Sequence, residues 1–226
     1  MAIRQPYAVC ALLMAAAVTI GCQRISHTDV SENSHEQEMI VDPRTSHPQE
    51  RIVETFNHNG VMVEVVEWTE TIWCGKVAYA ANDADESFAS RALDDYFAIT
   101  SKAPANEKRE SGWSVCISIN HLSSEHPDGV MYGDLVGTEQ QADGYDIYKV
   151  PAQRFMRIRL TEGTARALGR EPWKGGVPPY EWISEQIAPN YGYKIADGTQ
   201  PVFEYYGFYN PNTGAHEFCY LYVPVI

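Results

Sequence analysis

The chain has 226 residues, of which 44% are hydrophobic, and its formal net charge is −13. A chain of this length and hydrophobicity supports one domain with a substantial core. The acidic balance, with no basic cluster to follow a phosphate backbone, argues against nucleic acid as a partner and favours a cationic or neutral ligand. The many tyrosines (14) and tryptophans (5) favour a β-rich fold with aromatic surfaces that face water or a ligand.

The first 21 residues have the pattern of a targeting segment. The apolar run over residues 8–20 is too short for a typical membrane span and suits the hydrophobic region of a signal peptide. It ends at Gly21-Cys22, which resembles the lipobox of bacterial lipoproteins, where the cysteine becomes the acylated start of the mature chain. We therefore expect a protein of the bacterial cell envelope, anchored to a membrane through lipid on Cys22, with its domain outside the cytoplasm. Ordinary secretion, with Cys22 incidental, is the alternative.

The next segment, residues 22–58, is polar and acidic and has no sustained periodicity. Such a composition does not bury enough apolar surface to order itself, so a flexible tether is predicted there. The folded domain is then expected over residues 59–226. It opens with an alternating run over residues 61–80, which predicts a long strand with an irregularity near Thr69-Glu70.

Two helices are predicted after this strand. Residues 85–100 carry apolar side chains at helical spacing, with acids near the start that suit the helix dipole. Residues 179–187 form the second predicted helix, which Pro189 ends. The other predicted strands are residues 112–122, 129–139, 145–160 with a break at Pro151, 202–209 and 218–225.

The predicted order is strand, helix, strand, strand, and it occurs twice. It indicates an α+β fold of two strand–helix–strand–strand repeats of the SHS2 type. We expect the two repeats to be related by a pseudo-twofold, with antiparallel sheets and a ligand cleft at the joint.

Metal and cofactor sites are not expected. Cys74, Cys116 and Cys219 lie in apolar, strand-like runs without metal-ligand spacing, so they are interpreted as small buried hydrophobes. One disulfide can form among the three in an oxidising compartment, and the sequence leaves its pairing open. Nucleophile-elbow, zinc-protease and phosphate-loop motifs are absent from the sequence.

The acid Glu204 stands in an aromatic strand, Phe203-Glu204-Tyr205-Tyr206. Acids are depleted in strands, and a buried carboxylate needs a partner. Glu204 therefore either faces solvent or serves a ligand, as a counter-charge or as an acid/base group. The strand alone favours the solvent-facing alternative.

Three stretches carry a resemblance to a known family. They are residues 148–155 (YKVPAQRF, with Gln153 where Gly is common), residues 181–198 with Trp182, and Phe203–Tyr206 followed by residues 221–225 (LYVPV). Together they resemble the GyrI-like small-molecule-binding domain, which is also the effector-binding module of AraC-type and MerR-type regulators. The resemblance covers roughly residues 61–226 and is strongest in the second half.

The resemblance implies a set of site residues. In that family the glutamate of the corresponding strand faces the ligand cleft, which favours Glu204 as a ligand-binding residue. Tyr206 shares its face on an extended strand. Tyr132 matches an aromatic residue that lines the cleft, and Trp182 either closes the cleft or packs the core. Tyr220 and Tyr222 share a face of the neighbouring strand. Cross-strand aromatic packing is the alternative for the four tyrosines, and we expect about half of them to contact ligand.

The preferred function is a membrane-anchored protein that binds a lipophilic or cationic small molecule. The segment before residue 61 offers no DNA-binding domain, so a transcription factor is not expected. An alternative is a hydrolase of strained, cyclopropane-bearing molecules, as some free-standing members of the family are, with Glu204 as general base. A third hypothesis is a domain that docks on a protein or envelope component through its aromatic surface. The sequence identifies neither the ligand nor a protein partner.

Overall fold

A computed structural model of the chain describes residues 50–82, 85, 87–99, 114–120, 125–160, 179–196, 200–206, 209–210, 215–216 and 219–226. The predicted signal peptide, Cys22 and residues 22–49 of the predicted tether therefore lie outside the described residues. Within the described residues, no helix is long and apolar enough to cross a membrane.

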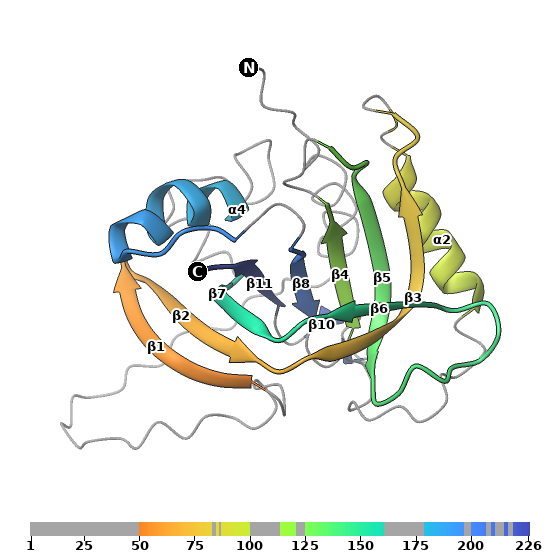
Figure 1. The fold of residues 1–226 in the computed structure, drawn as a ribbon, viewed down its shortest axis with the longest axis horizontal. Helices are drawn as coiled ribbons and strands as arrows, with labels where there is room; N and C mark the ends of the chain where they lie inside the picture. The colour runs from red at the N-terminus through yellow and green to blue at the C-terminus, as the bar shows by residue number, and fades with distance from the viewer. Residues whose placement is uncertain are drawn as a thin grey trace.

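The described strands form one nine-stranded sheet and a small two-stranded one (Figure 1). Every pairing between these strands is antiparallel. The large sheet has the order β1-β2-β7-β11-β8-β4-β5-β3-β6. Its strands are β1 Glu50–His58, β2 Val61–Trp68, β3 Thr71–Tyr79, β4 Ser114–Ile119, β5 Gly129–Val136, β6 Asp146–Val150, β7 Gln153–Arg159, β8 Val202–Tyr206 and β11 Cys219–Pro224. The small sheet pairs β9 Tyr209–Asn210 with β10 Ala215–His216.

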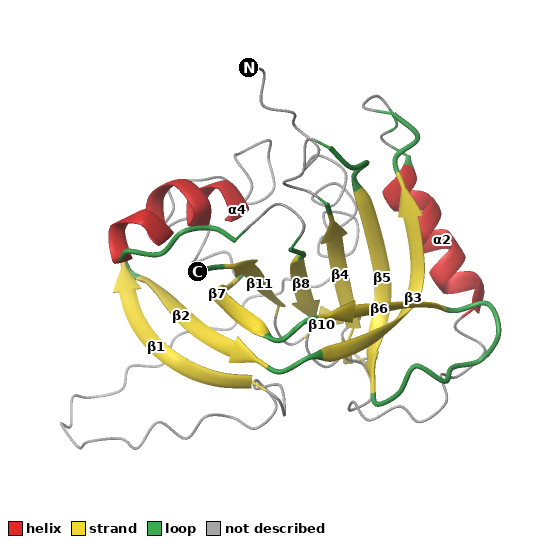
Figure 2. Ribbon diagram, in the orientation of Figure 1, coloured by secondary structure: helices red, strands yellow, loops and turns green. Residues whose placement is uncertain are grey.

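Two helical regions accompany the sheet (Figure 2). Helix α2, Phe88–Ile99, packs on β3 and β5. The second region starts as α4, Pro179–Trp182, and continues as a π-helical turn η1, Ile183–Ile187, and a 3-10 turn η2, Ala188–Tyr191. The chain leaves η2 at Gly192, whose φ of 80° a residue without a side chain adopts easily. A large antiparallel sheet with few helices confirms the predicted α+β class.

Two predicted strand breaks lie opposite each other. The first long strand divides into β2 and β3 at Thr69-Glu70, and the second divides into β6 and β7 at Pro151. Trp68 pairs with Gln153 on one side of the breaks, and Thr71 pairs with Val150 on the other. Both long strands therefore change direction together. This bend lets β2 pair with β7 while β3 pairs with β5, and the sheet curves strongly (Figure 1).

The two faces of this sheet bury different residues, because successive side chains on a strand point to opposite faces. We call one the aromatic face. It carries a cluster that includes Trp68, Trp73, Phe155, Phe203, Tyr205 and Tyr222. We call the other the helix face. There the second helical region covers Val63, Ile158 and Leu221, whereas α2 covers Cys116 and Val130.

The tether prediction was wrong for its last nine residues, Glu50–His58, which form strand β1. This strand pairs with β2 along its length, at the edge of the large sheet. Most of its side chains are exposed, and only alternate positions near its ends reach inward. A strand at an edge with so little buried surface keeps a polar composition, which explains why it was mistaken for a tether. The folded part of the chain therefore includes Glu50–His58.

Candidate ligand-binding site

Glu204 lies in the middle of β8, which is the fifth of nine strands in the sheet order. It pairs with Cys116 of β4 on one side and Leu221 of β11 on the other. Directly paired residues share a face. Leu221 packs beneath η1 and Cys116 packs beneath α2, so Glu204 lies on the helix face between the areas that the two helical regions cover. Its side chain is partly buried.

Tyr132 shares this face with Glu204. It lies on β5, pairs with Cys116, and packs against the cluster beneath α2. One row across the sheet therefore reads Leu221, Glu204, Cys116, Tyr132. The ring of Tyr132 and the carboxylate of Glu204 are separated by a single strand, about 10 Å between their backbones.

Tyr206 follows Glu204 by two residues at the end of β8, opposite Ser114 and Cys219. Its side chain lies outside the described residues.

Asp134 is a second acid on the helix face, and the sequence analysis missed it. It follows Tyr132 by two residues on β5 and is buried, with 5% of its surface exposed. The hydroxyl of Tyr96 on α2 donates a hydrogen bond to its Oδ2 atom at 2.9 Å. The signal that could have identified Asp134 from the sequence is its position as an acid within a predicted apolar strand. This contact fastens the second half of α2 to the sheet.

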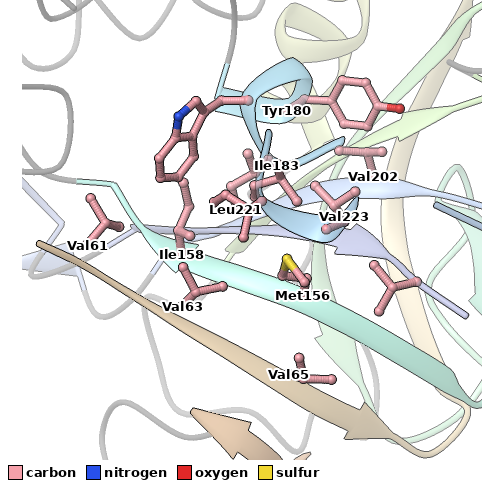
Figure 3. Packing of buried hydrophobic residues seen from close by; sticks show 14 residues of the cluster. Val61, Val63, Val65, Met156, Ile158, Tyr180, Ile183, Val202, Leu221 and Val223 are labelled. Atoms are coloured by element: carbon pink, nitrogen blue, oxygen red, sulfur yellow. The ribbon is translucent and has the colours of Figure 1, made fainter. Parts of the chain in front are cut away.

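Trp182 packs in the core beneath the second helical region. It is 3% exposed and belongs to the cluster of Val63, Ile158 and Leu221. Figure 3 shows how these strand residues gather beneath Ile183. The ring of His58 meets the indole of Trp182 edge-on, with centroids 5.5 Å apart. The sequence left two alternatives for Trp182, closing a cleft or packing the core. Its surroundings in the structure are those of a core residue.

Tyr220 and Tyr222 lie on the aromatic face, opposite to Glu204. Leu221 between them pairs with Glu204, so strand alternation turns both tyrosines the other way. Tyr222 stacks on Phe203 with centroids 4.6 Å apart. Tyr220 lies under the guanidinium of Arg157, 4.4 Å from its ring centroid. The structure therefore brings Glu204 and Tyr132 to one face and separates Tyr220 and Tyr222 from them.

The thiols and acids do not form a metal centre within the described residues, where no group of three or more metal-ligating side chains occurs. Cys74 and Cys116 are both buried, and no disulfide joins them to each other. The pairing that the sequence left open is therefore not a bond between these two. The side chain of Cys219 lies outside the described part of the chain.

Comparison with known proteins finds similarity in structure only. No protein-family model matches the sequence, and no curated protein matches it significantly. Among solved structures, SAV2435 bound to tetraphenylphosphonium has a TM-score of 0.49 and 11% identity, covering 73% of this chain and 93% of its own. A putative transcription regulation protein from Staphylococcus aureus MU50 has a TM-score of 0.47 and 12% identity, covering 74% of this chain and 99% of its own.

A further similar structure is the EcmrR C-terminal domain, with a TM-score of 0.43 and 10% identity over 73% of this chain and 96% of that domain. Similarity at this level assigns no residue of this chain a role.

Proposed function

We propose that this chain binds a small lipophilic or cationic molecule on the helix face, beside Glu204. The observation that carries the proposal is the position of this carboxylate. It lies in the central strand of the sheet, partly buried, between two apolar clusters that belong to different helical regions. Glu204 lies between the area packed under the second helical region and the area packed under α2. An acid with apolar side chains on both sides suits a ligand with an apolar body and a positive charge.

Physical chemistry favours a cation in this position. A carboxylate held among apolar side chains attracts a poorly hydrated cation more strongly than water-exposed carboxylates do. The ring of Tyr132 on the same face adds a cation–π surface. Asp134 adds a second acid, and the net charge of −13 attracts cations toward the whole molecule. Glu204, Tyr132 and Tyr206 are therefore the proposed ligand-binding residues.

We also propose that the domain consists of two related halves. Its described elements include β3, α2, β4 and β5 in the first half and β7, α4, β8 and β11 in the second. In the sheet order, one half reads β7, β11, β8 from the outside inward, and the other reads β3, β5, β4. The innermost strands, β8 and β4, pair with each other. This mirrored order supports a pseudo-twofold between β4 and β8, beside Glu204.

Anchoring to a membrane is part of the proposal. It is supported by the apolar run over residues 8–20 that ends at Gly21-Cys22. In this arrangement lipid on Cys22 supplies the membrane affinity, and the domain binds its ligand in the bacterial cell envelope. Residues 1–21 are the proposed signal peptide and residues 22–49 the proposed tether.

The ligand class can be tested by titration. Tetraphenylphosphonium, which SAV2435 binds, is a suitable lipophilic cation, and triphenylphosphine oxide is its uncharged counterpart. We expect saturable binding of the cation, measured by calorimetry and tyrosine and tryptophan fluorescence, and much weaker binding of the oxide. Equal binding of both compounds, or of neither, would contradict the proposal.

The fate of the ligand separates binding from hydrolysis. A neutral cyclopropane-bearing compound is incubated with the protein and then analysed by mass spectrometry. Recovery of the intact compound is expected from a binding protein. A hydrolysed product that depends on Glu204 would instead establish an enzyme.

A further inference from the structure

The carboxylate of Glu50 lies in a complete set of hydrogen-bond donors on the aromatic face. Trp68 Nε1 and the hydroxyl of Tyr222 donate to its Oε2 atom, at 2.6 Å and 2.8 Å. Arg157 Nη1 donates to its Oε1 atom. The three donors come from β2, β11 and β7, so three strands converge on one carboxylate. A charged donor on one oxygen and two neutral donors on the other form a specific receptor for a carboxylate group.

This donor set is held in place without Glu50. Arg157 Nε donates to Glu64 at 2.6 Å, and the guanidinium lies over the ring of Tyr220. The hydroxyl of Tyr222 also accepts a hydrogen bond from Arg157, at 2.9 Å. The side chains of Arg157 and Glu50 are 3% and 1% exposed. If Glu50 left, the remaining side chains would keep an oriented guanidinium, hydroxyl and indole N–H.

The occupant, in contrast, comes from a strand at the edge of the sheet order. Glu50 is the first residue of β1, which lies at the edge of the sheet and pairs with β2. Most other side chains of this strand are exposed, and its pairing is irregular between Ile52 and Glu54. The donors, in contrast, belong to inner strands. Glu50 can therefore leave the site without disrupting the strands that build it.

Stability alone explains this arrangement poorly. Burial raises the pKa of the Glu50 carboxyl, although Arg157 opposes this shift, so the ionised carboxylate is costly at this position. Buried ion pairs are often no more stabilising than apolar side chains of similar volume. An edge strand would be held more simply by an apolar residue, as at Ile52 and Phe56.

We propose that Trp68, Tyr222 and Arg157 form a second ligand site, specific for a carboxylate, which Glu50 occupies as an exchangeable plug. The rings of Tyr220, Tyr222 and Trp68 border the site, so a planar aromatic carboxylate is the favoured class of ligand. This site lies on the face opposite to Glu204 and does not depend on the function proposed there. It gives Tyr220 and Tyr222 a ligand-binding role apart from the Glu204 site.

The test compares benzoate with benzamide, its uncharged isostere, on the full chain of the wild type and of Glu50→Ala. Apparent affinity scales with the fraction of molecules whose site is open, so a plug in place nine times in ten weakens binding about tenfold. We therefore expect calorimetry to show at least about tenfold tighter benzoate binding to Glu50→Ala, and no gain for benzamide. Benzoate binding that is equal in the two proteins, or a matching gain for benzamide, would overturn the proposal.

A second measurement needs no variant. In the wild-type protein, saturating benzoate should displace Glu50 and speed hydrogen exchange of the β1 amides, whereas benzamide should not. Unchanged β1 exchange would overturn the plug mechanism.

If Glu50→Ala fails to fold, Glu50→Gln replaces it, and tighter benzoate binding than in the wild type is again expected. Glu54→Ala is the matched control, because Glu54 lies on the same strand and contacts Tyr193 instead, so its benzoate affinity should equal that of the wild type.

Discussion

Glu204 and Tyr222 lie on neighbouring strands and face opposite sides of the sheet. Their separation follows from one fact of register, the pairing of Glu204 with Leu221. A shift of one residue would bring Tyr222 to the face of Glu204 and bury different side chains on both faces. At the scale of single residues, the register therefore decides which groups act together.

The sequence predicted the strand around Glu204, but it did not predict the contacts that depend on pairing between distant strands. Strand alternation is local, so the sequence alone predicts that Tyr206 shares the face of Glu204. Contacts such as that between Glu50 and Arg157, 107 residues apart in the chain, depend on pairing between distant strands. Asp134 was missed for a similar reason, because its partner Tyr96 lies on α2. Local patterns contain no information about these partners.

The raised pKa of Glu50 predicts a pH dependence of stability. Between the ordinary carboxyl pKa of 4.5 and its raised value, the folded protein binds a proton that the unfolded chain does not. The contribution of Glu50 to the free energy of unfolding therefore rises as pH falls through this window, and is lost as pH rises. Denaturant titrations of wild type and Glu50→Gln between about pH 4 and pH 8 measure this contribution. The free energy of unfolding of the wild type should increase relative to that of Glu50→Gln as the pH falls. Glu64 and Arg157 face Glu50 and are present in both proteins. A difference that does not change with pH would contradict the account.

At the scale of elements, the close approach of β3 and β5 depends on glycine. Gly75 pairs with Gly133, and a Cβ atom at Gly75 would lie 1.9 Å from the carbonyl oxygen of Tyr132. We expect Gly75→Ala to force the two strands apart and to lower the free energy of unfolding by about 3 kcal/mol or more. Denaturant unfolding monitored by tryptophan fluorescence measures the loss.

Gly129 provides the matched control on the same strand pair. A Cβ atom there would meet the ring of Tyr79 at 2.7 Å, and this side chain is 48% exposed and free to move aside. Gly129→Ala should therefore cost clearly less than Gly75→Ala. An equal loss of unfolding free energy in the two variants would show that the pairing of β3 with β5 does not depend on the close contact at Gly75.

Elements with a strong periodic pattern were predictable, and the edge strand was not. The breaks at Thr69-Glu70 and Pro151 were confirmed, because proline and a lapse in alternation are local signals. The helix that starts at Pro179 was confirmed, but it runs on past Pro189 as a 3-10 turn to Tyr191. Strand β1 was missed because its hydrogen bonds to β2 order a segment whose side chains bury little.

At the scale of the whole molecule, one aromatic cluster joins strands on both sides of β8. Phe203 of β8 is 1% exposed and contacts Trp73 of β3 as well as Phe155 of β7 and Tyr222 of β11. Phe203→Ala should lower the global free energy of unfolding by about 3–5 kcal/mol, in a single transition seen by fluorescence and by circular dichroism.

Met62→Ala is the control for this prediction, since Met62 is 56% exposed and should change stability by no more than about 0.5 kcal/mol. Two separate transitions in Phe203→Ala, or a loss as small as that of the control, would show that the strands on the two sides of β8 unfold independently.

The two proposed sites occupy opposite faces of the same strands. Strand β8 carries Glu204 on the helix face, and β11 beside it carries Tyr222 on the aromatic face. A ligand on one face therefore touches strands that also form the other site. The curvature of the sheet was not predictable from composition, because it arises where two strands that are distant in sequence bend at the same place.

The most direct test of the central claim is the affinity for tetraphenylphosphonium of wild type, Glu204→Gln and Glu139→Gln. Glu139 is exposed and pairs with Lys149, so its variant changes charge equally without touching the helix face. At an effective dielectric constant of about 20, two unit charges roughly 8 Å apart attract by about 2 kcal/mol. We therefore expect binding at least about tenfold weaker in Glu204→Gln alone, measured by calorimetry. Equal affinity in all three proteins would contradict the assignment of Glu204 to the ligand site.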